Sequence, residues 1–580
     1  MNRPGFFAEL KRRNVYKVAV AYAVVGWLVM QVASTVVPAL HLPDSITTGV
    51  VVLVLLGFPI ALVIAWAFEM TPEGLKRTED VSPDEKIPQW SARKFAAFIL
   101  VVVICAAALL GYQVFRAKST PAPGPVSEKS IAVLPLVNQS GDPAQEYFSD
   151  GLSEELINGL GKISELRVIG RNSSFHFKGK TDDSRAIGQA LGVANLLEGS
   201  VRKAGDRVRI GLQLVNAADG SQRWSETYDR ELKDIFAIQE EIAKAVAEQL
   251  RVRLLGGAPS ISSQPSNENL AAYNFFLQAR AEYDKANPDA ASRAISLLDQ
   301  AIALDPNYAD AYVLKARALD ALAISGPDQS RQYFEKARMA VRTALALKPD
   351  LAGAHASLAY IYLFADWNFP AAEAELAMVR EKDPIVLNNL ATLRGIQGRW
   401  DESTALRQEV LRLEPLHAVY YTNLAQNLMR TDRWDEAETM LRKALELQPS
   451  TRFAHSLLGF VALNRGDLEV ALRDAKLEPV GWSRDGMLAC VQFARGEREQ
   501  ADQALQQLIA NFGEENPINI AQVYSVRREP EKMFEWLDRA YQRHQPALLS
   551  SLVGNPAYKP HYSDPRFVAL CNKIGIPIPK

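Results

Sequence analysis

A repeat of small residues constrains this 580-residue chain more than any other feature of its sequence. Small residues stand in pairs twelve positions apart, and successive pairs begin 30 to 34 residues further on. A small residue late in one helix and another early in the next let the two helix axes approach closely, so this period predicts stacked helical hairpins. The repeated positions are Ala359 and Ala371, Ala391 and Ser403, Ala425 and Ala437, Gly459 and Ala471, Ala489 and Ala501, and Ala521 with the larger Met533.

Prolines and one tetrapeptide follow the same period. Arg-Trp-Asp-Glu occurs twice, at residues 399–402 and 433–436. A proline cannot continue a helix, so it marks the end of a unit; the closing prolines are Pro306, Pro349, Pro384, Pro415, Pro449 and Pro479. The pattern predicts about eight repeats over residues 269–545 and a C-terminal cap over 546–580. It resembles the tetratricopeptide repeat, and the resemblance implies a solenoid that binds proteins or peptides.

The first 115 residues contain three uncharged runs, at residues 18–43, 45–68 and 95–115. Each run reaches the roughly 20 residues that cross a hydrocarbon core of ~30 Å. The first run is longer than the apolar region of a cleaved signal peptide, which has ~7–15 residues. We therefore predict a multi-domain chain with three transmembrane helices, at about 18–40, 46–68 and 95–115, followed by a small α+β domain and an all-α solenoid of helix–turn–helix repeats.

Basic residues flank the uncharged runs unevenly. Five precede the first run and five separate the second run from the third, whereas the short loop between the first two runs has none. Basic flanks stay in the cytoplasm, so we expect residues 1–17 and the loop 69–94 to be cytoplasmic. Residues 116–580 would then be periplasmic, in a multi-pass protein of the bacterial inner membrane. No Asp, Glu, Lys or Arg lies inside the runs, which favours a plain anchor in the lipid bilayer over a transporter.

The block 130–255 is predicted to be an α+β domain between two linkers, the Pro-rich segment 116–129 and the segment 256–268. Strand-like and helix-like patterns alternate in it, and Ala204-Gly205-Asp206 and Ala218-Asp219-Gly220 are turn signals. Two stretches, SIAVLPLVNQSGDPAQEYFSDGLSEELINGL and LGVANLLEGSVRKAGDRVRIGLQLVNAADG, are similar to the FlgO-like, or TolB amino-terminal-like, domain. The resemblance implies an extracytoplasmic binding or scaffolding domain of the bacterial envelope.

Signalling proteins with this two-part architecture carry a cyclase or a winged-helix DNA-binding domain on the cytoplasmic side. Neither residues 1–17 nor the loop 69–94 is long enough to fold such a domain. We therefore do not transfer cyclase or transcription-factor activity to this chain.

The composition and motifs point away from catalysis and from nucleic-acid binding. The net charge is −2, the pI is near 6.5, and the C-terminal half has no basic block with interleaved aromatics. None of the seven histidines forms a metal-ligand spacing, and Gly179-Lys180-Thr181 lacks the earlier glycine of a phosphate loop because Ser174 stands there. We predict no enzyme activity, no cofactor and no metal. Cys490 and Cys571 are interpreted as separate thiols, with pairing left open.

The leading hypothesis is a membrane-anchored scaffold that binds protein partners in the periplasm on the concave face of its repeats. Residues placed there by the pattern are Tyr360, Asn388, Gln426, Arg430 and Phe460. The alternative is a non-catalytic sensor or signalling subunit. It would pass binding through its membrane helices to a cytoplasmic partner at the loop 69–94. The sequence leaves the oligomeric state open.

Overall fold

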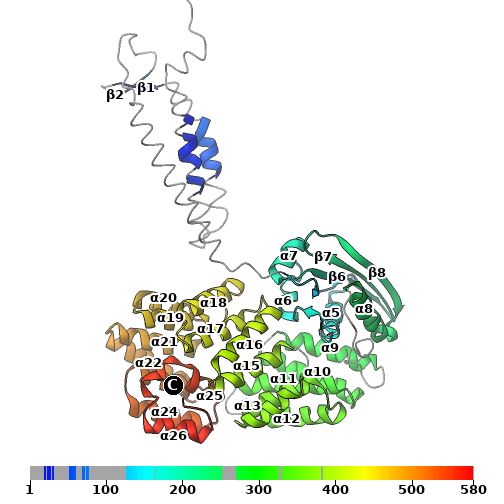
Figure 1. Cartoon of the computed structure of the whole chain (residues 1–580). Helices are drawn as coiled ribbons and strands as arrows, with labels where there is room; N and C mark the ends of the chain where they lie inside the picture. Colours follow the sequence, from blue (N-terminus) through cyan, green and yellow to red (C-terminus); the bar gives the residue numbers. More distant parts are fainter. Residues whose placement is uncertain are drawn as a thin grey trace, which may run out of the picture. The chain divides into compact units, whose positions relative to one another are not determined.

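The computed structural model describes residues 126–578, except 164, 251–268, 286, 326–329 and 380–382, together with parts of the stretch 19–77 (Figure 1). The linker predicted at 256–268, and most of the one predicted at 116–129, lie outside the described residues. The chain divides into two compact units, Met1–Gly124 and Pro125–Lys580.

The prediction of three transmembrane helices is wrong for the described part of the first unit. No helix described there, or elsewhere in the structure, is both long and apolar enough to cross a membrane. The helix described over residues 51–59 would span only about 14 Å, and it contains Gly57 and Pro59, which are poor residues for a helix interior. The predicted span 95–115 lies outside the described residues. The predicted location as a multi-pass inner-membrane protein depended on these helices, so that prediction is wrong as well.

A two-stranded antiparallel hairpin occupies the start of the predicted loop 69–94. Strands β1 (Phe68–Thr71) and β2 (Gly74–Arg77) pair so that Phe68 faces Arg77 and Thr71 faces Gly74. The chain is therefore extended at Phe68, where the second helix was predicted to end. An uncharged run satisfies the length requirement of a membrane span, but it does not determine the local secondary structure.

The second unit begins with an α+β domain built on one mixed sheet. Its strands are β3 (Ser130–Val133), β4 (Val137–Asn138), β5 (Arg167–Val168), β6 (Asn195–Ala204), β7 (Arg207–Asn216) and β8 (Gln222–Glu231). The strand order in the sheet is β5-β3-β6-β7-β8, and β4 pairs with β6 beside this path. Strand β3 pairs with β5 and β6 in parallel, whereas β6, β7 and β8 form an antiparallel meander. Gly205 makes the β6–β7 turn with φ of 60°, a conformation that favours glycine.

Helices cover the two faces of this sheet. Helices α5 (Glu146–Gly161) and α8 (Ile235–Gln249) pack on one face with Ile131 and Val133, and α7 (Ser184–Leu191) packs on the other with Ala132 and Leu134. Strand β3 is buried on both faces, as expected for a strand with neighbours and helices on each side. The remaining short helices are η2 (Pro143–Gln145), α6 (Arg171–Phe175) and η3 (Leu232–Asp234).

The rest of the unit is a stack of helical hairpins, which confirms the all-α solenoid part of the predicted fold (Figure 1). A short segment of α25, η5 and α26 follows the last hairpin. The helices are α9 (Leu270–Tyr283), α10 (Pro288–Leu304), α11 (Ala309–Ser325), α12 (Ser330–Leu347), α13 (Ala352–Phe364), α14 (Phe369–Ala377), α15 (Pro384–Ile396), α16 (Trp400–Leu413), α17 (Ala418–Arg430), α18 (Trp434–Leu447), α19 (Ala454–Arg465), α20 (Leu468–Leu477), α21 (Gly481–Ala494), α22 (Arg498–Phe512), α23 (Pro517–Val526), α24 (Pro530–Gln542), α25 (Ala547–Gly554), η5 (Pro556–His561) and α26 (Pro565–Ile574).

The small residues of the repeat lie where hairpin helices meet. Each of the repeated positions is buried except Ala371, which is half-buried while its neighbour Ala372 is fully buried. At Gly459 an added Cβ would lie 3.3 Å from Met487 and 3.4 Å from the carbonyl of Ala471, so the helices leave little room for a larger side chain. Close helix approach is thus the physical reason for the sequence period.

The α+β domain and the first hairpins share one hydrophobic core. Helix α9 packs on α5 and α8, and Phe236 meets Tyr273 edge-to-face at 5.1 Å between ring centroids. A Cβ on Gly151 would lie 2.4 Å from Leu277, so glycine permits the close approach of α5 and α9. The interface is therefore a continuous core, and it joins two segments that the sequence separates by the linker 256–268.

Glu414 makes a second contact between the domain and the repeats. It follows α16, and its carboxylate accepts hydrogen bonds from the backbone N–H groups of Asn172 (3.2 Å) and Ser173 (2.8 Å) at the start of α6. The N–H of Gly170 donates to the Leu413 carbonyl at 2.8 Å. A residue of the repeats thus caps a helix of the α+β domain. Burial raises the pKa of Glu414, and the bonds from Ser173 and Asn172 oppose that shift.

The C-terminal segment returns to earlier hairpins. Helix α25 contacts α15 and α17 as well as α23 and α24. Trp367, between α13 and α14, stacks on His544 with 3.7 Å between ring centroids, and Lys559 pairs with Asp432 at 3.0 Å. The segment predicted as a terminal cap therefore also joins hairpins that are distant in the sequence.

We predict that Glu414→Ala uncouples α6 from the repeats. The change leaves two backbone donors without acceptors, which costs about 1–3 kcal/mol for each buried group. Hydrogen exchange should accelerate in this variant at Asn172 and Ser173, and also at Leu416, whose N–H donates to Ser173 Oγ at 2.9 Å. Glu478→Ala is the matched control, because Glu478 stands in the same Leu-Glu-Pro sequence but caps Phe453 and Ser456 inside the repeats. Unchanged protection of α6 in Glu414→Ala would contradict the capping role.

Candidate functional site

The candidate site lies on the first helices of the hairpins. Helix α11 contacts α13, α13 contacts α15, and the same holds for α19 with α21 and α21 with α23. We call the joint surface of these first helices, α9 to α23, the first-helix face. Side chains on it that are not used in the core are the ones available to a partner.

Three half-buried tyrosines come together on the first-helix face. Tyr283 is on α9, Tyr360 on α13 and Tyr420 on α17. Burial raises the pKa of each phenol, and Tyr283 lies close enough to both of the others to contribute to their shifts. Within the described chain none of the three hydroxyl groups makes a hydrogen bond. They are large, rigid contact surfaces with unused polar ends.

A buried carboxyl group stands beside two of these tyrosines, Tyr283 and Tyr360. Asp320 on α11 is 7% exposed, and its Oδ1 has no hydrogen-bond partner among the described residues. Burial raises its pKa well above the usual range, and the nearby Arg317 opposes that shift. Asp320 in turn contributes to the raised pKa of Tyr360. An unsatisfied buried acceptor of this kind is costly unless something donates to it.

A second polar cluster connects α15, α16 and α17. Asn388 Oδ1 accepts hydrogen bonds from Arg407 Nη1 at 3.1 Å and from Asn423 Nδ2 at 3.3 Å. Arg407 is only 9% exposed, whereas Asn388 and Asn423 are half-buried. The cluster therefore runs from the core of the hairpin to its accessible surface.

The predicted site residues fall into different surroundings. Tyr360 joins the tyrosine group and Asn388 joins the Arg407 cluster, while Gln426 is exposed on α17. Phe460 packs partly buried between two hydrophobic clusters of the repeats. Arg430 lies over Trp400 at 5.5 Å and over Tyr562 at 5.1 Å, so it is engaged by the C-terminal segment. The structure therefore does not gather the five residues into one patch.

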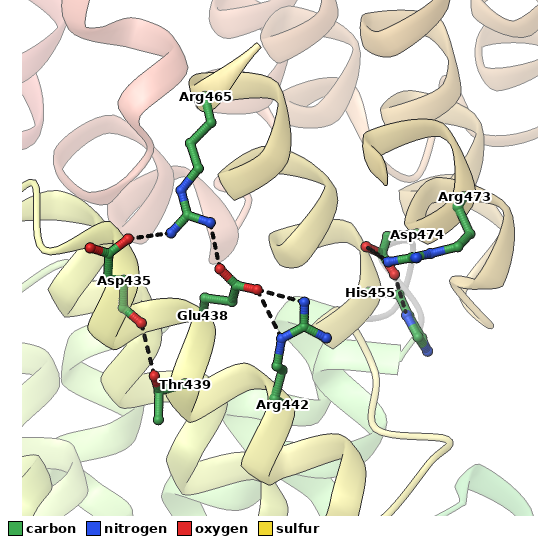
Figure 2. Close-up of polar contacts among 8 residues, drawn as sticks. All are labelled: Asp435, Glu438, Thr439, Arg442, His455, Arg465, Arg473 and Asp474. Carbon is green, nitrogen blue, oxygen red and sulfur yellow. Dashed lines mark hydrogen bonds and ion pairs between the residues drawn. The ribbon is translucent and has the colours of Figure 1, made fainter. Parts of the chain in front are cut away.

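Arginines near the ends of several other first helices connect neighbouring hairpins through ion pairs. Figure 2 shows Arg465, near the end of α19, reaching Asp435 and Glu438 on α18, with Arg442 also on Glu438. Asp474 pairs separately with His455 and Arg473 in the same view. The pairs made by Arg465 and Arg442 are exposed contacts of modest energy, whereas Asp474 is buried. The same connection recurs as Arg394 with Glu373, Arg495 with Glu469, and Arg527 with Asp502.

The described residues contain no group of three or more His, Cys, Asp or Glu placed to hold a metal ion. His355, for example, is engaged by Glu375 at 2.6 Å and by the Pro349 carbonyl at 2.8 Å. Cys490 and Cys571 are both buried free thiols, so the structure does not pair them.

The sequence pattern did not single out Tyr283, Asp320, Arg407 or Tyr420. A signal existed for Arg407, because the two Arg-Trp-Asp-Glu copies align it with Leu441. No such signal exists for Asp320 or the tyrosines, because their proximity depends on how α9, α11, α13 and α17 stack.

The comparisons with known proteins match parts of the chain. Residues 383–450 match the tetratricopeptide repeat family. A protein of Rhizobium meliloti (strain 1021), called putative adenylate cyclase 3, is 41% identical over 192 residues, which is 33% of this chain and 33% of that protein. The chain thus spans about a third of the length of this curated relative.

Two bacterial repeat structures are also similar. Pseudomonas aeruginosa pilF is 19% identical with a TM-score of 0.30, covering 35% of this chain and 92% of that one. PilW, described as a type IV pilus biogenesis factor, is 17% identical with a TM-score of 0.28, covering 44% of this chain and 99% of that one.

We predict that Arg430→Ala loosens the C-terminal segment. The change removes two cation–π contacts, together worth about 1–2 kcal/mol at a half-buried position. Hydrogen exchange in η5 should increase, and the urea midpoint should fall. Arg465→Ala is the matched control, because its exposed ion pairs contribute only about 0.2–1 kcal/mol. If Arg430→Ala and Arg465→Ala lowered the urea midpoint equally, Arg430 would not stabilise the C-terminal segment more than an exposed ion pair does.

Proposed function

We propose that this tetratricopeptide repeat protein is a scaffold that binds a protein partner on its first-helix face. The observation that carries the proposal is the group of Tyr283, Tyr360 and Tyr420, with the unsatisfied Oδ1 of Asp320 beside Tyr283 and Tyr360. Stacked repeats present extended, preformed surfaces, and such surfaces are used for recognition of other chains.

The chemistry of this surface suits a protein partner. Tyrosines supply large contact areas and lose little side-chain entropy on binding, which is why they are enriched at interface hot spots. Asp320 offers an acceptor to a partner's N–H or O–H group, and that bond would satisfy the buried oxygen. The surface would thus combine apolar contact with one directional polar anchor.

The α+β domain would act as part of the same scaffold. Its resemblance to FlgO-like, or TolB amino-terminal-like, domains supports a binding role rather than a catalytic one. Its shared core with α9 and its contact through Glu414 hold it against the repeats that carry the tyrosines. A partner could therefore contact both parts without a domain rearrangement.

A signalling subunit is the second candidate. The observation that favours it is the 41% identity to putative adenylate cyclase 3 over 192 residues. In this role the repeats would bind a partner and pass the event to another signalling protein. We propose no cyclase activity for this chain, because its sequence offers no catalytic constellation and the similarity covers a third of each protein.

Site-specific photocrosslinking in cells tests the scaffold proposal. A benzophenone amino acid at Tyr360 should give a defined crosslinked product with a second protein, identified by mass spectrometry. The same probe at Met339, an exposed residue on the second helix α12, is the control. The proposal fails if Tyr360 gives no product, or if the same products arise from both positions. A cyclase, kinase or regulator as partner would favour the signalling role.

The affinity for that partner should depend on the tyrosine group. We expect Tyr283→Ala and Tyr420→Ala each to weaken binding at least tenfold, because hot-spot aromatics contribute about 2 kcal/mol or more. Met339→Ala should leave the affinity unchanged. Calorimetry with the captured partner measures this difference, and circular dichroism checks that the variants remain folded.

A further inference from the structure

Arg407 occupies a core position that is apolar in the neighbouring hairpins. Aligned on their N-cap residues, the second helices α14, α16, α18, α20, α22 and α24 place equivalent side chains at the same point of the hairpin. In α16 the residue is Arg407. In the others it is Leu376, Leu441, Ala475, Leu505 and Leu537, all of them buried.

The guanidinium of Arg407 lacks a counter-charge. It is 9% exposed, no described carboxylate forms an ion pair with it, and its Nε has no hydrogen-bond partner. Burial lowers the pKa of Arg407 to about 10, with no acidic group acting in the opposite direction. A buried unpaired charge destabilises a protein, and an apolar residue of similar volume at such a site is often more stable. Folding alone therefore does not account for an arginine here.

The nearby acidic residues at the ends of this hairpin are committed elsewhere. Asp383 caps α15 through the N–H groups of Ile385 and Val386, at 2.7 and 3.1 Å. Glu414 caps α6 of the α+β domain. Neither is available to neutralise Arg407, and no other described residue supplies the missing negative charge.

The neighbours of Arg407 hold it in a fixed orientation and leave one edge unused. Asn388 Oδ1 accepts from Nη1 and is itself held by Asn423 at 3.3 Å. The Nε edge stays without an acceptor, and the Nδ2 group of Asn388 donates to none of the described residues. Because Asn388 and Asn423 are half-buried, the amide side of the cluster is accessible from the surface.

We propose that Arg407, Asn388 and Asn423 form a binding site for a carboxylate on an acidic side chain of the partner protein. The inference rests on the proposed scaffold function and names one group that the partner must supply. A monoanion neutralises the single buried positive charge, whereas a phosphate dianion would leave a net negative charge in the same site. Carboxylate geometry also suits a guanidinium edge with one free N–H and a neighbouring amide donor.

Binding of a fluorescein-labelled octaglutamate peptide to the full chain tests the proposal by fluorescence anisotropy. Arg407→Leu introduces the residue that the neighbouring hairpin carries at this position, so we expect it to fold with an equal or higher melting temperature. It should bind the peptide at least tenfold more weakly than the unmodified chain. Arg407→Lys should be intermediate, because an ammonium keeps the charge and loses the planar donor pair.

Arg412→Leu is the matched control. It removes the same charge from the same helix at an exposed position, and octaglutamate affinity should not change. Equal binding by Arg407→Leu and the unmodified chain would overturn the proposal, as would no binding to the unmodified chain. If free glutarate displaces the peptide at equal carboxylate concentration, the site takes small carboxylates and the assignment to a protein side chain is overturned.

The experiments distinguish failure of the scaffold proposal from failure of the carboxylate-site proposal. A partner crosslinked at Tyr360 that binds Arg407→Leu with full affinity would leave the scaffold function standing and remove only the carboxylate site. Loss of octaglutamate binding in Arg407→Leu without any crosslinked protein would support the anion site and count against the scaffold.

Discussion

The shared core between the α+β domain and the first hairpins is the constraint on which the rest of the second unit depends. In a simple solenoid each repeat contacts only its neighbours, so its curvature follows from small rotations between repeats. Here α5 and α8 pack on α9, and Glu414 attaches the end of α16 to α6. The hairpins between α9 and α17 are thus held at both ends by one domain. That restraint fixes the relative positions of side chains on α9, α11, α13 and α17.

Polar groups inside the repeats serve two different purposes. Most arginines near the ends of first helices reach acidic residues of the preceding hairpin, as Arg465 does, and these pairs need no outside partner. Asp320 is buried with one oxygen unsatisfied, and Arg407 is buried with no described counter-charge. Apolar residues of similar volume at these positions would often make the fold more stable. Asp320 lies on the first helix α11, and Arg407 bonds to Asn388 on the first helix α15, which is the physical reason for placing the binding surface on the first-helix face.

The Leu-Glu-Pro sequence shows which structural features a local sequence pattern predicts and which it does not. It occurs at residues 413–415 and again at 477–479, and both glutamates are buried. Glu478 caps backbone donors within the repeats, whereas Glu414 caps a helix of the α+β domain. The motif predicts a buried cap at the end of a hairpin. Which donors it caps depends on what the fold brings against it, and no local pattern contains that information.

The period of small residues and prolines determined the helical hairpins, because close helix approach leaves a direct mark on the sequence. The turn signals placed the β6–β7 hairpin for a similar reason, since its backbone conformation requires glycine at Gly205. Uncharged runs did not determine membrane helices, because apolar composition alone does not fix secondary structure. The shared core, the tyrosine group and the isolation of Arg407 were decided by tertiary structure alone. Each depends on distances between segments far apart in the chain, and the free energy of such contacts arises only once the hairpins are stacked.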